Sequence, residues 1–116
     1  MLTARNVLFL LVDDGGFELG AFGNKAISTP NIDALAARST AFDAAFTSVS
    51  SCSPSRSAIL TGLPTHQNGM YGLHQYPAQF ESWSDVVSLP NLLTSAGYKT
   101  GVIGNYHIGP STDRPP

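Results

Sequence analysis

The longest apolar run of the sequence, residues 6–12 (NVLFLLV), stops at the adjacent aspartates Asp13 and Asp14. A continuous, partly β-branched run of this length is typical of a strand buried on both faces of a parallel sheet. Residues 41–46 (AFDAAF) alternate loosely, and residues 98–103 (YKTGVI) follow a helical pattern. We expect both segments to be further strands.

Helical patterns separate these apolar segments. Helices are predicted over residues 30–39, 54–60 and 88–97, and each contains a proline in its first turn. Ser53 is the expected N-cap of the middle helix, and Gly62 is expected to close it. The alternation of strands and helices predicts an α/β fold with a mostly parallel sheet flanked by helices.

Residues 62–88 have no clear period and are rich in glycine and aromatic residues. We expect a long, ordered surface loop with room for short strands. In parallel sheets, ligands gather beyond the carboxyl ends of the strands. Three groups follow predicted strands or precede a helix at that edge: the pair Asp13 and Asp14, then Cys52, then residues 105–107. Their order along the chain predicts one site.

Composition narrows the class of protein. The 116 residues are about one domain in length, and only 12% of them are charged, roughly half the usual share. Such low charge is typical of a chain whose surface is covered by something larger. The net charge of −2, without a basic cluster, argues against nucleic acid as a partner. The sequence shows neither a membrane-spanning run nor a secretion signal, and its single cysteine excludes an internal disulfide.

Asp13 and Asp14 allow two interpretations. Adjacent carboxylates at the end of a buried strand repel each other unless a cation or hydrogen-bond donors offset them. A hard cation such as Ca²⁺ or Mg²⁺, which prefers oxygen ligands, would do so. Alternatively, the two aspartates are turn formers before the glycines that follow them.

Cys52 lies among serines, with Pro54 and Arg56 close behind it (SVSSCSPSR, residues 48–56). At the start of a helix, the dipole would favour its thiolate, and Arg56 one turn later would hold an anion beside it. The alternative is a small buried residue, with Arg56 on a solvated face. A cysteine-phosphatase loop is disfavoured, because it needs a longer spacing between cysteine and arginine.

His107 follows a predicted strand and lies between glycines. It is a candidate proton donor or anion contact, although a histidine in a turn is more often structural. His66 and His74 lie in the long loop, and their positions assign them no role.

Five motifs together resemble the sulfatase family and follow one another in the order which that family uses. They are LLVDDGG at 10–16, STPNIDALAARS at 28–39, CSPSR at 52–56, LTGLPTHQNGMYGLH at 60–74, and the G-x-x-H-x-G pattern at 104–109. The C-x-P-x-R element alone is moderately specific, and its combination with the double aspartate is strong. The resemblance covers nearly the whole chain, and it implies that residues 1–116 are the N-terminal, truncated part of a sulfatase catalytic domain.

The resemblance implies an alkaline-phosphatase-like fold and a role for each candidate residue. Asp13 and Asp14 match ligands of one Ca²⁺ ion, which Cys52 would also contact. Cys52 matches the cysteine that is converted to formylglycine, whose hydrated aldehyde offers one hydroxyl to attack sulfur and a second to expel sulfate. Arg56 matches the residue that holds formylglycine, and His107 matches the active-site histidine.

The chain departs from the family pattern at Asn105, where the family has a lysine (G-K-x-H). Asparagine offers a neutral donor in place of a full positive charge, and charge-assisted hydrogen bonds are roughly twice as strong as neutral ones. We expect the exchange to cost about 2–4 kcal/mol of transition-state stabilisation. Ca²⁺ also needs about six or more oxygen ligands, more than these residues supply.

The function that the resemblance implies is hydrolysis of sulfate esters or sulfamates on a sulfated sugar, and N-sulfoglucosamine in heparan-type glycans fits best. An inactive remnant or a glycan-binding pseudoenzyme is the alternative. The implied partners are the sulfated glycan, a formylglycine-generating enzyme and a second copy in a homodimer of the full-length form. The implied location is lysosomal or secretory.

Overall fold

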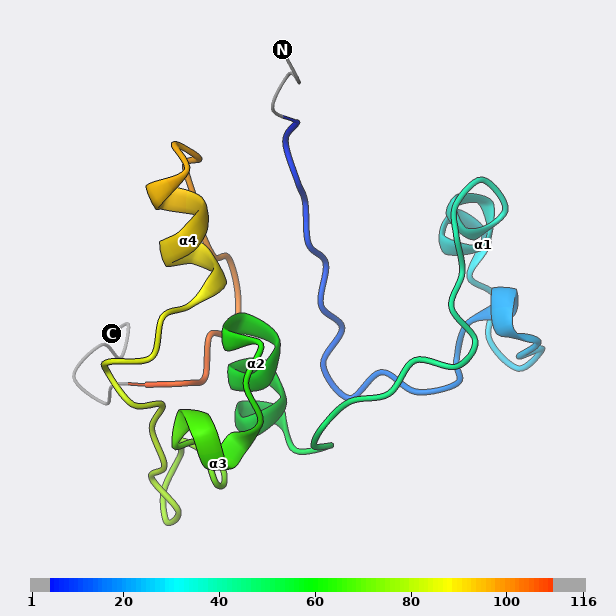
Figure 1. The fold of residues 1–116 in the computed structure, drawn as a ribbon. Coiled ribbons are helices and arrows are strands. Elements are labelled where there is room, and N and C mark those ends of the chain that lie inside the picture. The colour runs from blue at the N-terminus through cyan, green and yellow to red at the C-terminus, as the bar shows by residue number, and fades with distance from the viewer. Residues whose placement is uncertain (1–4, 110–116) are drawn as a thin grey trace. The chain divides into compact units, whose positions relative to one another are not determined.

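A computed structural model describes residues 5–109 of the chain. The chain divides into two compact units, Met1–Ala45 and Phe46–Pro116, and each is described by itself. Within residues 5–109 the backbone forms helices and irregular segments, and it forms no strand (Figure 1). No helix in this part of the chain is long and apolar enough to cross a membrane.

The strands predicted over residues 6–12, 41–46 and 98–103 are therefore not formed, and this part of the α/β prediction is corrected. A strand requires a neighbour that pairs its N–H and C=O groups, and a parallel strand also requires cover on both faces. Along residues 6–12 the structure has no ladder of backbone hydrogen bonds, and Val7 and Leu8 are 80% and 82% exposed. The apolar pattern is present, but residues 5–109 leave most of these side chains uncovered.

The first unit contains helix α1, Pro30–Ala36, and a 3-10 helix η1, Gly20–Phe22. Helix α1 begins at the predicted proline and ends somewhat earlier than predicted. The Asp33 carboxylate accepts hydrogen bonds from the Ala21 N–H (2.8 Å) and from the Thr29 hydroxyl (2.9 Å). These bonds hold η1 against α1, although the sequence offered no periodic signal for η1.

The second unit is organised around helix α2, Cys52–Thr61. Its N-cap is Ser51, not Ser53 as predicted, and the Ser55 N–H donates to the Ser51 carbonyl at 2.9 Å. Pro54 fits inside the first turn because the first four N–H groups of a helix have no intrahelical acceptor. Gly62 ends the helix as predicted, in a left-handed conformation with φ 69°.

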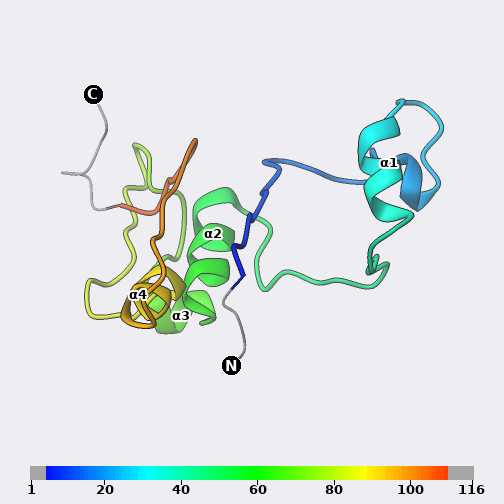
Figure 2. The same ribbon diagram turned by 90° about the horizontal axis from the view of Figure 1, so that it is seen from above.

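Two shorter helices contact α2, namely α3, Thr65–Asn68, and α4, Leu89–Ser95 (Figure 2). Helix α4 confirms the predicted helix near residues 88–97, and Ser88 is its N-cap. Helix α3 lies in the region predicted to be a loop. It is only one turn long, too short to produce a detectable apolar period.

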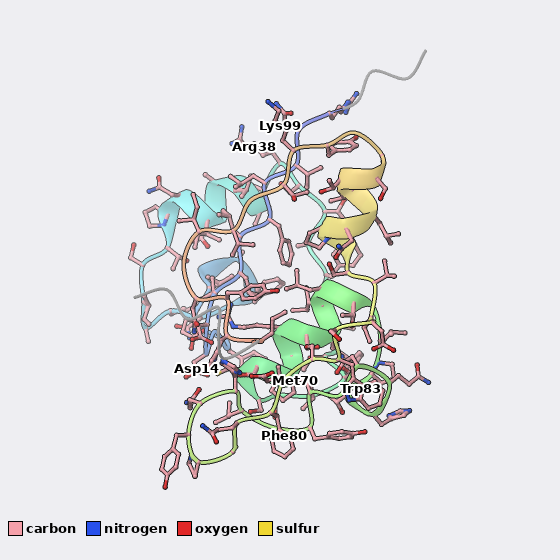
Figure 3. All side chains as sticks on the ribbon, turned by 90° about the vertical axis from the view of Figure 1, so that its left-hand side faces the viewer. Asp14, Arg38, Met70, Phe80, Trp83 and Lys99 are labelled. Carbon is pink, nitrogen blue, oxygen red and sulfur yellow. The ribbon has the colours of Figure 1, made fainter. Side chains whose placement is uncertain are left out.

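The loop that follows α3 packs closely on itself (Figure 3). Met70 is fully buried, and the Trp83 N–H donates to the Asn68 carbonyl at 2.9 Å. A Cβ atom on Gly69 would lie 2.5 Å from the Trp83 indole, so this close approach requires glycine. The prediction of an ordered segment is confirmed, and its order comes from contacts within residues 62–88 and with α2.

Candidate active site

Cys52 is the first residue of α2 and is half-buried. The first turn of a helix presents backbone N–H groups and the positive end of the helix dipole, which favour an anion there. The predicted placement at a helix start is confirmed, and the helix begins at the cysteine itself rather than after it.

One face of α2 carries hydroxyl groups at intervals of four residues: Ser53, Ser57 and Thr61. Ser53 and Ser57 are fully buried. The Ser53 Oγ accepts a hydrogen bond from the His74 N–H at 3.1 Å, and the Ser57 and Ser82 hydroxyls lie 2.7 Å apart. Because buried hydroxyls need partners, these bonds fix how α2 sits against the loop.

Arg56 lies one turn after Cys52 and is half-buried. Its Nη1 donates to the backbone carbonyl of Asn105 at 2.6 Å. Arg56 therefore ties α2 to the segment that carries His107. The bond uses the main chain of Asn105, so it does not depend on which side chain that position carries.

His107 sits in a turn whose backbone is unusual. Gly104, His107 and Gly109 all have positive φ, at 103°, 59° and 75°. A left-handed conformation at a non-glycine residue costs about 1–3 kcal/mol, and it persists only where the surroundings hold it. The His107 Nε2 faces the amide oxygen of Gln75 in a hydrogen bond, and its ring lies edge-on to the ring of His74, with 6.3 Å between the centroids.

Asp13 and Asp14 belong to the first unit, where they form a turn after residues 6–12. Both are exposed, and Asp14 has a φ of 50°. The apolar run ends at this turn, where the sequence places the two aspartates. Two adjacent carboxylates in an exposed turn are suitable donors for a hard cation, but they offer fewer oxygens than Ca²⁺ takes, so the metal role stays a prediction.

The second unit thus joins two of the predicted site residues, Arg56 and His107, to one polar network. The network also includes Ser53, His74 and Gln75, whose roles the sequence did not indicate. Their contacts link positions far apart in the chain, as in the Gln75–His107 pair, which is 32 residues apart. The sequence offers one indication of these residues: His74 ends the motif at 60–74, and Gln75 follows it directly.

Comparisons with known proteins identify the family of the chain. Residues 5–114 match the family model named Sulfatase, so the chain belongs to the sulfatase family. The chain is 64% identical, over 111 residues, to human N-sulphoglucosamine sulphohydrolase, and the match covers 96% of this chain and 22% of that protein. It is 38% identical to bovine arylsulfatase A over 106 residues, which covers 90% of this chain and 21% of the relative.

A third relative is canine N-acetylgalactosamine-6-sulfatase, 35% identical over 113 residues, with 90% of this chain and 22% of that protein covered. The chain therefore spans about a fifth of the length of the curated relatives it matches. Nearly all of this chain takes part in the family match, but the match covers only a small part of each relative.

Proposed function

We propose that this chain is the nucleophile-bearing part of a sulfamidase, an enzyme that removes sulfate from N-sulfoglucosamine in heparan-type glycans. The observation that carries the proposal is the 64% identity to human N-sulphoglucosamine sulphohydrolase across nearly all of the chain. The C-x-P-x-R motif at the start of α2 supports it, since Cys52 opens the helix and Arg56 lies one turn on.

In this proposal Cys52 is the residue converted to formylglycine, with a formylglycine-generating enzyme as the partner that modifies it. When formed, formylglycine supplies paired hydroxyls for covalent catalysis. Arg56 would hold this group and offset its charge while its Nη1 remains bonded to the Asn105 carbonyl at 2.6 Å. His107 would donate a proton or contact the sulfate.

Asp13 and Asp14 are the proposed protein ligands of a Ca²⁺ ion, together with Cys52 after its conversion. When bound, the ion would polarise a sulfate oxygen. Calcium takes about six to eight oxygens, so further ligands would have to come from residues other than these.

The finer part of the fold prediction also belongs to this proposal. We propose an alkaline-phosphatase-like sheet in which residues 6–12, 41–46 and 98–103 become strands once neighbouring strands cover them. The exposure of Val7 and Leu8 supports it, because such apolar side chains are usually buried. A lysosomal or secretory location and a homodimer of the full-length form follow from the family.

A second candidate is a glycan-binding protein without turnover, and Asn105 favours it. The position that carries a lysine in the family pattern here holds a neutral side chain. Such a protein would bind sulfated glycans and leave them intact.

The test is sulfate release from an N-sulfated glucosamine oligosaccharide by the natural protein, produced in cells that make formylglycine. The sulfamidase proposal expects release that a Cys52→Ala variant lacks. Binding of the oligosaccharide without any release, by protein whose Cys52 has been converted, would contradict it and support the second candidate.

A further inference from the structure

The His107 side chain is held by Gln75, which lies just outside the motif at 60–74. The amide oxygen of Gln75 faces His107 Nε2, and an amide oxygen can only accept a hydrogen bond. In this arrangement Nε2 is the donor and carries the hydrogen. In the neutral imidazole this selects one tautomer, which leaves Nδ1 as the acceptor.

The segment that carries Gln75 is itself anchored. The preceding residue, His74, donates its backbone N–H to the buried Ser53 hydroxyl at 3.1 Å. The His74 Nδ1 lies 3.1 Å from the Phe80 carbonyl. A Cβ atom on Gly109 would lie 3.1 Å from His74 Cε1, so the end of the His107 turn also packs against His74.

A continuous set of contacts thus connects the start of α2 with the turn of His107. Ser53 follows Cys52 directly in the helix, Ser53 holds the backbone of His74, and Gln75 holds the His107 ring. The left-handed backbone of His107, with φ 59°, needs such support, because this conformation persists only where its surroundings fix it.

We propose that Gln75 is a positioning residue of the site. Its amide fixes the tautomer and the ring orientation of His107, and residues 74–75 transmit the position of α2 to that ring through Ser53. The catalytic consequence rests on the proposed sulfate hydrolysis, whereas the tautomer does not.

The first experiment measures the tautomer in the chain itself, by ¹⁵N NMR of the histidine side chains at about pH 8, where imidazoles are mostly neutral. With three histidines in the sequence, the signals can be assigned by substituting His66 and His74 in turn. The wild type is expected to show the Nε2–H form at His107. Gln75→Met removes the acceptor at similar size and should give a mixture, whereas Gln75→Glu keeps an acceptor and should preserve the form.

The matched control is Gln67→Met, which makes the same exchange at an exposed position of α3 and should leave His107 unchanged. An Nδ1–H form in the wild type, or a His107 signal that Gln75→Met does not alter, would overturn the proposal.

The second experiment measures kcat and KM for sulfate release by the natural protein. A positioned proton donor contributes on the order of 10²–10⁴-fold to the rate, so a misoriented His107 ring should forfeit part of that contribution. We expect Gln75→Met to lower kcat by about 10-fold or more with little change in KM, and Gln75→Glu to restore much of that loss. An unchanged kcat in an active enzyme would refute the positioning role. If the wild type releases no sulfate, the proposed function fails, and the NMR result still decides the role of Gln75.

Discussion

Helix α2 and the apolar run at residues 6–12 are both organised for burial, but only α2 achieves it within this chain. The buried face of α2 carries Ser53 and Ser57, which are fully buried and hydrogen-bonded to residues of the following loop. The run at 6–12 exposes Val7 and Leu8 almost completely. The difference lies in the partners: α2 finds them within the second unit, whereas the run needs other strands.

The comparison shows that the two regions differ in where their packing partners come from. The residues proposed for the chemistry near Cys52 are held by hydrogen bonds within the second unit, so their arrangement is specified by about sixty residues of sequence, 46–109. The sheet that family membership implies depends on strand neighbours. Substitutions in the two regions should therefore have effects of different kinds.

The largest effect is expected at Cys52. Cys52→Ala removes the proposed nucleophile and should lower sulfate release by about 10³-fold or more, as when a covalent nucleophile is lost. The fold around α2 should persist, because its buried bonds come from Ser53 and Ser57. Sulfate release and amide hydrogen exchange of α2 measure the two outcomes. If Cys52→Ala lost the hydrogen-exchange protection of α2 together with its activity, the conclusion that Cys52 is not needed for the fold of α2 would be contradicted.

The next effect is expected at Asn105. Asn105→Lys should raise turnover on the order of 10²-fold, because it returns a positive charge to the proposed site. The hydrogen bond from Arg56 to position 105 uses the backbone carbonyl, so the exchange should leave that link intact. The rate of sulfate release checks this prediction, with Asn105→Gln as the neutral control. If Asn105→Lys, with Cys52 converted to formylglycine, turned over no faster than the wild type, the reaction would not need a positive charge at position 105.

A smaller effect on stability is expected from Ser57→Ala. The substitution removes the 2.7 Å hydrogen bond between buried Ser57 and Ser82, at a cost of about 1 kcal/mol. Urea unfolding followed by the fluorescence of Trp83, the only tryptophan, measures it. Ser84→Ala, at an exposed serine, is the control. Equal losses of unfolding free energy in Ser57→Ala and Ser84→Ala would contradict the conclusion that the buried hydrogen bonds of α2 stabilise the second unit.

The smallest effect is expected at Leu8, which is 82% exposed. Leu8→Asn should change the free energy of unfolding of this chain by no more than about 0.5 kcal/mol. Met70→Ala, at a fully buried position, is the contrasting variant and should cost about 2–5 kcal/mol. Urea unfolding of the two variants measures both changes in free energy. A large loss of stability in Leu8→Asn would show that the run at 6–12 is packed.

The same distinction explains what could be predicted from the sequence. Helix ends were found where a single residue determines them, as with Pro30, Gly62 and Ser88, because capping and proline geometry are local. The strands failed in this structure because an apolar run records a preference for burial and says nothing about the presence of its neighbours.

The candidate site divides in a similar way. The motifs located Cys52, Arg56 and His107 by type and spacing, and the structure confirms Cys52 at a helix start. The support from Gln75 was not predictable, because it joins residues 32 apart and depends on a left-handed turn. Short motifs indicate which residues are candidates for the chemistry, whereas the packing of the loop determines which residues contact them.

The central claim is that Cys52 is a formylglycine precursor rather than a working thiol. Intact mass and peptide sequencing by mass spectrometry of the protein, made in a secretory pathway with formylglycine-generating enzyme, test it directly. Conversion exchanges one sulfur and two hydrogens for one oxygen. The account predicts this mass decrease on the peptide that contains Cys52, together with reactivity toward an aldehyde probe. A peptide that carries an unmodified thiol under these conditions would contradict it.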